Sequence, residues 1–383
     1  MNDLSAIIAN EARSHGAITF ARFMELALYC PNSGYYDLTE TTVGRSGDFY
    51  TSVSVGSLFG QLLAFQFAEW LDALSSPLGL DAPRSSTQIV ESGAHDGRLA
   101  GDILGWLHSK LPKLLDTLEY WIIEPSSART RAQKQTLSEF AASVRWFPEW
   151  NAIPAAGVNG IIFSNELLDA MPVHRIGWDA SEKEWFEWGV TIRPGDHDFI
   201  WTRLPAGPDL LARGLPDLPG HLLDVLPDGF TTEVGLAAID WWSQAASALR
   251  SGRLLTIDYG LAAEEFFLPE RNQGTLRAYH RHRMSSDLLA RPGEQDLTAH
   301  VNFTAIQSAG ESRGLHTDTF QTQAQFLTAI LERFEQDRSG FGDWTPKHAR
   351  QFQTLTHPSH LGRPFRVLVQ SRMTAVPRTG SHS

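Results

Sequence analysis

The sequence predicts an α/β protein built on a doubly wound parallel sheet, and three observations predict it. Short runs of β-branched and aromatic residues, at Gln88–Val90 and Tyr120–Ile123, precede segments of helical periodicity at Leu99–Leu111 and Ser126–Phe140. A glycine-spaced turn, ESGAHDG at 91–97, directly follows the first run. Further β-rich runs lie at Val144–Phe147, Gly160–Phe163 and Leu254–Ile257. In sheets of this kind, ligands bind at the carboxyl ends of the strands.

The first 75 residues are expected to form a helical extension. Apolar residues recur at helical spacing from Asp3 to Leu28, with a break at Gly16, which predicts two helices. The longer segment Val55–Leu74 is apolar on most of its faces, which predicts a buried helix. Proline, serine and glycine are frequent in Ser75–Ser86, so we expect a boundary there.

A long insertion is expected after the fourth strand. About ninety residues separate this strand from the next β-rich run, which is far more than a crossover helix needs. Part of the stretch, His174–Arg203, alternates in hydrophobicity like an antiparallel meander. After the extension at 1–75, the predicted regions are an α/β core at 85–172 and 230–375 and an inserted substrate or lid region at 173–229.

The composition argues against several classes of partner. The formal net charge of −12 gives no bulk attraction for phosphate backbones or anionic membranes, so we expect neither a nucleic acid nor a membrane partner. The single cysteine, Cys30, excludes an internal disulfide and a cysteine-based zinc site, and the histidine spacing predicts no other metal site. The N-terminal stretch has neither an apolar signal core nor an arginine-rich, acid-poor composition, so a cytoplasmic location is expected.

Glycines and acids follow the ends of the first two predicted strands. Glu91, Gly93 and Gly97 follow the first, and the glycines allow a tight turn whose backbone N–H groups approach a ligand closely. Glu124 follows the second strand, where an acid can accept hydrogen bonds from both hydroxyls of a ribose. An acid at this place is equally often a helix cap, and the residues alone leave both interpretations open.

Two carboxylates follow the fourth predicted strand. Glu166 and Asp169 stand three residues apart, so a helix starting near Asn165 would carry both on one face of its first turn. They would then complement the helix dipole, which is the favoured interpretation of the pair in isolation, or act on a substrate. Asp258 follows the fifth strand in the same way.

Taken together, these segments resemble the MidA family of S-adenosylmethionine-dependent methyltransferases, whose mitochondrial members assist respiratory complex I assembly. The resemblance spans Ile18 to about Phe303, and its blocks in order are ITFARFMELALYCPNSGYY, GDFYTS, LFGQLL, ESGAHDG, IIEPS, SNELLDAMPV, IDYG, GTLRAY and DLTAHVNF. It implies a class I, Rossmann-like methyltransferase sheet with an N-terminal helical extension and an insertion after the fourth strand. It also implies S-adenosyl-L-methionine as the cofactor.

The resemblance further implies roles for individual residues. Asn165, Glu166 and Asp169 would line the pocket where the methyl group is transferred. Glu124 would hold the ribose diol, and a loop containing Asp48 would close over the cofactor. The full set of implied cofactor-binding residues is Gly47, Asp48, Thr51, Glu91, Gly93, Gly97 and Glu124.

Two departures from the family pattern bear on activity. The usual glycine-proline-glycine turn is here Gly93-Ala94-His95-Asp96-Gly97, and His95 replaces the glycine in the middle of this stretch. Its side chain must therefore point away from the ligand or touch it. Val53 and Ser54 stand where the family has a proline and an acid, which removes a charge near the pocket.

We expect methyl transfer to a protein arginine, with a respiratory complex subunit as the partner by family analogy. A guanidinium with a pKa above roughly 12 is not a free nucleophile, but Glu166 and Asp169 could orient it. The alternatives are an oxygen or small-molecule acceptor and an assembly factor or chaperone with little transferase activity. A nicotinamide-dependent oxidoreductase is disfavoured because no G-x-G-x-x-G follows the first strand.

Overall fold

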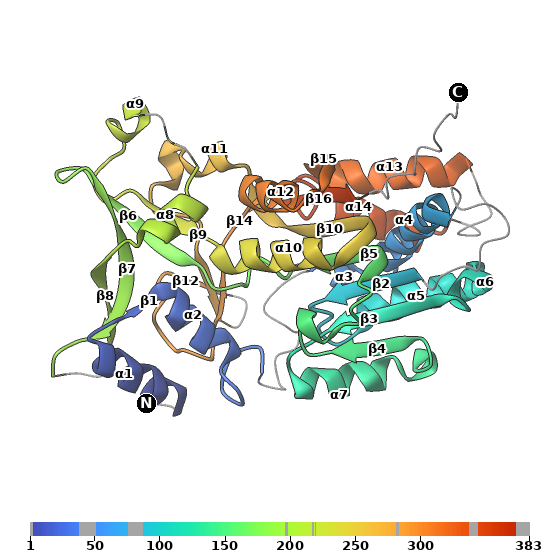
Figure 1. Ribbon diagram of the computed structural model, residues 1–383, viewed down its shortest axis with the longest axis horizontal. Helices are drawn as coiled ribbons and strands as arrows, with labels where there is room; N and C mark the ends of the chain where they lie inside the picture. Colours follow the sequence, from blue (N-terminus) through green and yellow to red (C-terminus); the bar gives the residue numbers. More distant parts are fainter. Residues whose placement is uncertain are drawn as a thin grey trace, which may run out of the picture.

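The computed structural model describes residues 3–37, 51–75, 87–195, 198–216, 218, 220–280, 283–336 and 344–372. Its centre is an eight-stranded sheet with the order β15-β16-β10-β5-β2-β3-β4, and β14 pairs with β10 beside this path (Figure 1). Its strands are β2 (Thr87–Ser92), β3 (Leu118–Ile123), β4 (Val144–Phe147), β5 (Val158–Asn165), β10 (Leu249–Leu261), β14 (Val301–Asn302), β15 (His316–Thr322) and β16 (Phe365–Arg372).

The sheet reverses its direction of growth next to its first strand. β2 pairs in parallel with β3 on one side and with β5 on the other, and β5 pairs in parallel with β10. The chain therefore runs outward from β2 to β4 and then returns to the other side of β2. The carboxyl ends of β2 and β5 meet at this switch point, where open α/β sheets bind their ligands.

Helices cover both faces of the sheet, because successive residues of a strand point to opposite faces. Ile89 belongs to a core cluster with α4 (Leu58–Ser75), α5 (Arg98–Lys110), α13 (Gln323–Gln336) and α14 (Pro346–Thr356). Its neighbour Val90 belongs to the opposite cluster, with α10 (Leu236–Ala248) and α12 (Phe303–Ser312). Because the central strands are buried on both faces, their sequences are nearly continuous apolar runs.

A second sheet lies beside the first, on the left in Figure 1. It has five strands in the order β1-β7-β6-β9, with β8 paired to β7. The expected meander is therefore present as antiparallel β6, β7 and β8. The bounds are β1 (Ile18–Thr19), β6 (His174–Asp179), β7 (Glu184–Ile192), β8 (Phe199–Pro205) and β9 (Thr231–Val234).

The N-terminal helices pack against this second sheet. They are α1 (Asp3–His15) and α2 (Phe20–Tyr29), and the side chain of Thr19 caps α2 by accepting a hydrogen bond from the N–H of Arg22. Their apolar residues share a core cluster with Val190 of β7 and Leu297. The N-terminal segment therefore belongs to the half of the molecule that faces the carboxyl ends of the central strands.

A third, three-stranded sheet was not predicted from the sequence. It consists of β11 (Arg277–His280), β12 (Arg283–Ser285) and β13 (Asp296–Thr298). The remaining short elements are α3 (Ser52–Val55), α6 (Pro112–Leu115), α7 (Ser127–Thr136), η2 (Ser138–Phe140), η3 (Trp150–Ala152), α8 (Pro208–Gly214), α9 (Gly220–Leu223), α11 (Ala263–Phe266) and η4 (Pro269–Arg271).

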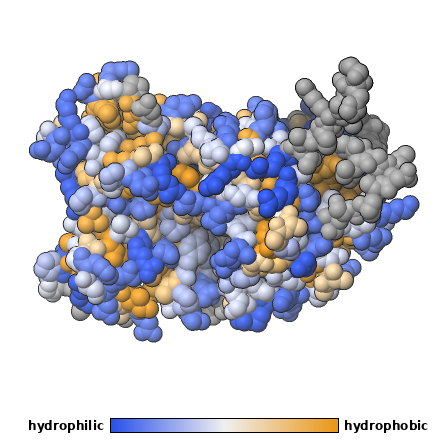
Figure 2. Space-filling model, in the orientation of Figure 1, coloured by the Kyte–Doolittle hydropathy of each residue, from blue (hydrophilic) through white to orange (hydrophobic). Residues whose placement is uncertain are grey.

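The predicted doubly wound sheet with an insertion after its fourth strand is confirmed. The helix expected at 126–140 is α7 followed by the 3-10 turn η2, and the helix expected at 55–74 is α4 preceded by α3. None of the described helices combines the length and apolar character needed to cross a bilayer. Hydrophilic residues predominate on the face shown in Figure 2, where hydrophobic residues form small separate patches.

Candidate functional site

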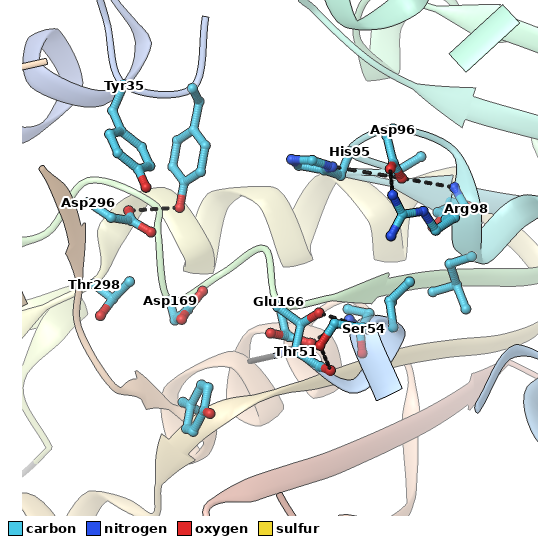
Figure 3. Close-up of a pocket in the computed structure, with 18 residues that line it drawn as sticks. Tyr35, Thr51, Ser54, His95, Asp96, Arg98, Glu166, Asp169, Asp296 and Thr298 are labelled. Carbon is cyan, nitrogen blue, oxygen red and sulfur yellow. Dashed lines mark hydrogen bonds and ion pairs between the residues drawn. The ribbon is translucent and has the colours of Figure 1, made fainter. Parts of the chain in front are cut away.

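Two adjoining hollows lie at the carboxyl ends of β2 and β5. The first, shown in Figure 3 and called here the acidic cavity, is lined by Glu91, Asn165, Glu166, Asp169 and Asp296, among others. The second, called here the cleft, extends past the ends of β3 and β4 toward α2. The two hollows share four lining residues, which are Tyr36, Gly93, His95 and Glu166.

The turn after β2 takes an unusual backbone conformation. Gly93, His95 and Gly97 all have a positive φ, of 78°, 46° and 83°. A Cβ atom built on Gly93 would lie 2.8 Å from the side chain of Leu167, so a larger residue would have to displace that side chain. Gly97 leads directly into α5 as its N-cap. The turn therefore directs the start of α5 toward the switch point, as a ligand-binding turn requires.

Glu124 lies at the end of β3 and lines the cleft. Its Oε1 accepts a hydrogen bond from the backbone N–H of Ser126 at 2.9 Å, and its Oε2 accepts one from Nε2 of Gln133 at 3.0 Å. Burial raises the pKa of Glu124, although these hydrogen bonds lower it. Both sequence-based interpretations are partly met, since the carboxylate supports the start of α7 and also borders the cleft.

Gln133 links Glu124 to the glycine turn. The same Nε2 atom donates to the backbone oxygen of His95 at 3.0 Å, and Oε1 of Gln133 accepts from Nε1 of Trp146 at 3.1 Å. Gln133 is fully buried. Because every polar atom of its amide has a partner, Gln133 holds the turn and Glu124 at a fixed separation.

Glu91 lies beneath the turn, at the floor of the acidic cavity. It is buried, and its Oε2 accepts a hydrogen bond from the hydroxyl of Tyr120 at 2.6 Å. Burial raises the pKa of Glu91 to about 7, against the lowering effect of this hydrogen bond. Glu91 therefore titrates near neutral pH while the site is free of a cation.

The expected helix after β5 is absent, so the prediction that Glu166 and Asp169 share its first turn is wrong. Asn165 is the last residue of β5, and Glu166 has a φ of 52°, which starts a turn instead of a helix. The buried carboxylate of Asp258 stabilises that turn, because its Oδ2 accepts the N–H groups of Leu167 and Leu168 at 3.1 and 2.8 Å. Dipole complementation therefore does not explain this acidic pair.

Glu166 is held by two hydrogen bonds to one oxygen. Its Oε1 accepts from the backbone N–H of Ser52 at 3.1 Å and from Nδ2 of Asn165 at 3.1 Å. Neither bond engages Oε2. Burial, with a smaller contribution from the charge of Asp258, raises the pKa of Glu166 to about 8, against the lowering effect of these two hydrogen bonds.

Asp169 and Asp296 bring two more carboxylates to the cavity, and both are buried. Asp296 belongs to β13, far along the chain, and its Oδ1 accepts a hydrogen bond from the hydroxyl of Tyr36 at 2.8 Å. Burial raises the pKa of Asp169 well above its usual range, and the charges of Asp258, Asp296 and Glu166 add to this. Figure 3 shows Asp169, Asp296 and Glu166 along one side of the hollow, opposite His95 and Arg98.

Tyr36 connects this cavity to the start of α7. Its backbone oxygen accepts hydrogen bonds from Nε and Nη2 of Arg129, at 2.9 and 2.8 Å, and the Arg129 guanidinium lies 5.3 Å from the centre of its ring. The next residue, Asp37, accepts a hydrogen bond from the hydroxyl of Ser126 at 2.8 Å. The N-terminal segment thus reaches both the cleft and the cavity.

Some predicted residues lie in the cavity and two cannot be placed. Thr51, Val53 and Ser54 line it, close to Glu166. Thr51 also caps α3, by accepting a hydrogen bond from the N–H of Ser54. The predicted loop residues Gly47 and Asp48 lie outside the described residues.

Sequence reasoning assigned no role to Tyr36, Asp296 or Thr298, although each lies in a block that resembles the family. The signal was the polar and aromatic content of the GYY and DLTAHVNF blocks. Within the described ranges, no group of three or more histidine, cysteine, aspartate or glutamate side chains could hold a metal ion.

The donor set suits an S-adenosyl ligand. The cleft offers an acid, Glu124, beside a glycine turn, and it continues past Gly93 into the acidic cavity. In the acidic cavity, Oδ1 of Asn165 is buried and accepts no hydrogen bond from the described residues. Such an orphaned acceptor suits an amino group or another cationic donor, because a buried polar atom without a partner is costly.

Comparisons with known proteins agree with this geometry. A family model described as "Putative S-adenosyl-L-methionine-dependent methyltransferase" matches residues 62–321. A curated relative from Drosophila melanogaster, "Protein arginine methyltransferase NDUFAF7 homolog, mitochondrial", is 27% identical and is covered over 82% of its length by 93% of this chain. The Rattus norvegicus protein, "Protein arginine methyltransferase NDUFAF7, mitochondrial", is also 27% identical, with 92% of this chain and 80% of that protein aligned.

One solved structure is similar to this chain over nearly its whole length. It is a Burkholderia thailandensis protein crystallised with S-adenosyl-homocysteine, which is 31% identical to this chain. The superposition has a TM-score of 0.78 and covers 96% of this chain and 92% of that one.

The relatives correct one expectation. The cytoplasmic location predicted from the N-terminal composition is wrong by this comparison, because the curated relatives from Drosophila melanogaster, Rattus norvegicus and Homo sapiens are all named as mitochondrial proteins. The N-terminal composition therefore does not decide the location.

Proposed function

The chain belongs to the family of S-adenosyl-L-methionine-dependent methyltransferases, and from that premise we propose that its methyl acceptor is the guanidinium group of an arginine in a protein. It is an enzyme whose methyl donor is S-adenosyl-L-methionine. The observation that carries the proposal is the gathering of three carboxylates around one cavity beside the donor cleft: Asp169 and Asp296, which are buried, and Glu166, which is half-buried.

We assign the donor to the cleft and its junction with the cavity. Glu124 would accept hydrogen bonds from the ribose, and the turn at Gly93 and Gly97 would lie along the ribose and methionine. Glu91 and Thr51 would border the methionine. The donor, when bound, supplies an electrophilic methyl group on a positively charged sulfur.

The electrostatics of the cavity favour a cationic acceptor. Burial keeps the pKa values of Glu166 and Asp169 above their usual range, and no positively charged side chain of the described residues compensates their charges. The nearest arginine lining the cavity, Arg98, is already paired with Asp96 at 3.2 Å. A bound guanidinium would lower the pKa values of these carboxyl groups and so favour their ionised forms. Its charge-assisted hydrogen bonds would offset the cost of desolvating the carboxylates.

The shape of the cavity favours arginine over lysine. A guanidinium presents five N–H donors in one plane, and the carboxylates here come from different elements, Glu166 after β5 and Asp296 on β13.

The chain's own groups then orient the nucleophile and take its proton. Asp169 and Asp296 would hold two guanidinium nitrogens, which leaves the third directed toward the donor. Oε2 of Glu166, which the Ser52 and Asn165 hydrogen bonds leave free, would accept the proton that this nitrogen loses as its bond to the methyl carbon forms. The electron pair of the broken carbon–sulfur bond stays on sulfur, so the charges balance.

The names of the curated relatives support this acceptor, since both describe protein arginine methyltransferases. A respiratory complex subunit is the protein substrate that the family resemblance suggests. The rival acceptors are an oxygen nucleophile or a small molecule. A neutral hydroxyl could donate to one carboxylate, but it brings no positive charge to balance the three acids.

Paired peptides test the proposal. One peptide set carries arginine and a matched set carries citrulline, which keeps the shape but replaces the cation with a neutral urea. We expect methyl transfer from labelled S-adenosyl-L-methionine to the arginine peptides and at least about a hundredfold less to the citrulline peptides. Equal labelling of both sets would refute a guanidinium acceptor.

A further inference from the structure

His95 occupies a strained position at the junction of the two hollows. Its φ of 46° lies in the left-handed region, which non-glycine residues seldom adopt. The family resemblance implies a glycine at this place. The carbonyl of His95 is fixed by Gln133, and its turn is bounded by Gly93 and Gly97, which also have positive φ. The backbone therefore stays in this conformation although a side chain makes it less favourable.

The imidazole of His95 faces the hollows. His95 lines both the acidic cavity and the cleft, and Figure 3 shows its ring directed into the open space of the acidic cavity. Its Nδ1 lies 3.8 Å from Oδ1 of Asp96, and no described residue makes a hydrogen bond to its Nε2. The ring is about one third exposed, so it can reach a ligand without first leaving a packed position.

A ligand that reaches from Glu124 into the acidic cavity crosses the junction that His95 lines. Glu124 borders only the cleft, whereas His95 and Glu166 border both hollows. A glycine at this place offers only its backbone, whereas an imidazole offers an aromatic face and a ring nitrogen. The polar groups of the S-adenosyl ligand at this point are the ribose ring and the methionyl chain, both of which can bond to imidazole.

We propose that His95 is a donor-binding residue, whose imidazole contacts the ligand where the ribose joins the methionyl chain. The contact replaces the open space above a glycine turn and offsets the backbone strain at this position. The proposal concerns the donor alone, so it does not depend on the nature of the acceptor.

Titration calorimetry of the full chain with S-adenosyl-homocysteine tests this role without any measurement of catalysis. His95→Gly removes the ring and the strain together, and His95→Asn keeps a residue that tolerates positive φ but is too short to make the contact. We expect both variants to bind about fivefold more weakly, the usual effect of one lost hydrogen bond, with thermal midpoints at or above that of the parent.

His108 provides the matched control, because it is an exposed histidine of α5 that lines neither hollow. His108→Asn should change the affinity by less than about twofold. Undiminished affinity in both His95 variants would overturn the proposal, and so would an equal loss in His108→Asn. Because the probe is the demethylated product, this result stays separate from any failure of the arginine proposal.

Discussion

Oε1 of Glu166 accepts a hydrogen bond from the backbone N–H of Ser52 at 3.1 Å, across 114 residues of sequence. Ser52 is fully buried, and its hydroxyl donates to Oε1 of Gln323. This link fixes the position of one oxygen of the Glu166 carboxylate. Oε2 is thereby left for a ligand, which distinguishes Glu166 from an acid that only stabilises the fold.

Glu166→Gln should lower methyl transfer by at least about a hundredfold, or about 2.7 kcal/mol in the transition state. The amide oxygen can still accept the Ser52 N–H, so the turn should persist, but no group then takes the acceptor's proton. Donor affinity, measured by calorimetry, should stay within error of the parent. The surface variant Glu139→Gln controls for the same chemical change, and a Glu166→Gln enzyme with parental turnover would remove Glu166 from the mechanism.

The raised pKa of Glu166 predicts how stability depends on pH. The folded protein retains the Glu166 proton up to about pH 8, whereas the unfolded chain releases it near the ordinary glutamate value. Between these two values the folded state binds more protons, so the free energy of unfolding should fall as pH rises. Glu91, with a pKa raised to about 7, contributes in the same direction.

Denaturant unfolding at pH 5, 6, 7 and 8 checks this prediction, in the absence of donor and acceptor. Glu166→Gln cannot ionise, so its stability relative to the parent should increase steadily over this range. A difference between the two proteins that does not change with pH would show that Glu166 is already ionised in the folded state.

Glu124→Ala should weaken S-adenosyl-homocysteine binding by about 1.5 to 3 kcal/mol, the usual value of hydrogen bonds to a charged group. The N–H of Ser126 and the amide of Gln133 also lose a partner, so a modest fall in thermal midpoint is expected as well. Calorimetry separates the two effects. If the stability falls while the affinity stays unchanged, Glu124 supports α7 and does not bind the ribose.

Asp258 was considered in the sequence only as an acid at a strand end, but the structure makes it a positioning residue. Its two oxygens accept the N–H groups of Leu167, Leu168 and Tyr259. Asp258→Asn replaces one acceptor oxygen with a donor, so at least one of these groups loses its partner, at a cost of about 1 to 3 kcal/mol.

We therefore expect Asp258→Asn to lower both thermal stability and turnover, with a smaller effect on donor affinity than Glu124→Ala produces. Asp318→Asn is a matched control, because Asp318 also borders β16 but lies away from both hollows. Unchanged turnover in Asp258→Asn would show that the turn after β5 is held by other contacts.

Features that depend on local sequence were predicted correctly. The alternation of apolar runs and helical segments identified β2 to β5 and the helices between them, because buried parallel strands and amphipathic helices have distinct periodicities. The glycine turn was recognised for the same reason, since Gly93 and Gly97 adopt the positive φ that glycine permits.

Features that depend on contacts between distant parts of the chain were not predicted correctly. Local spacing suggested a helix at Glu166, but the N–H groups that would start it bond to Asp258, about ninety residues away in the chain. The third carboxylate, Asp296, reaches the cavity only because β13 pairs with β11 and Tyr36 packs beside it. The periodicity of a single segment does not indicate that two distant segments lie side by side.

The identity of the methylated atom tests the central claim most directly. The full chain is incubated with S-adenosyl-L-methionine carrying a labelled methyl group and with the arginine peptides, and the purified peptide is hydrolysed to free amino acids. We predict that the label is recovered as methylarginine, and that Asp296→Asn reduces this product. Label recovered instead as a methyl ester, on lysine or on a small molecule would contradict an arginine acceptor.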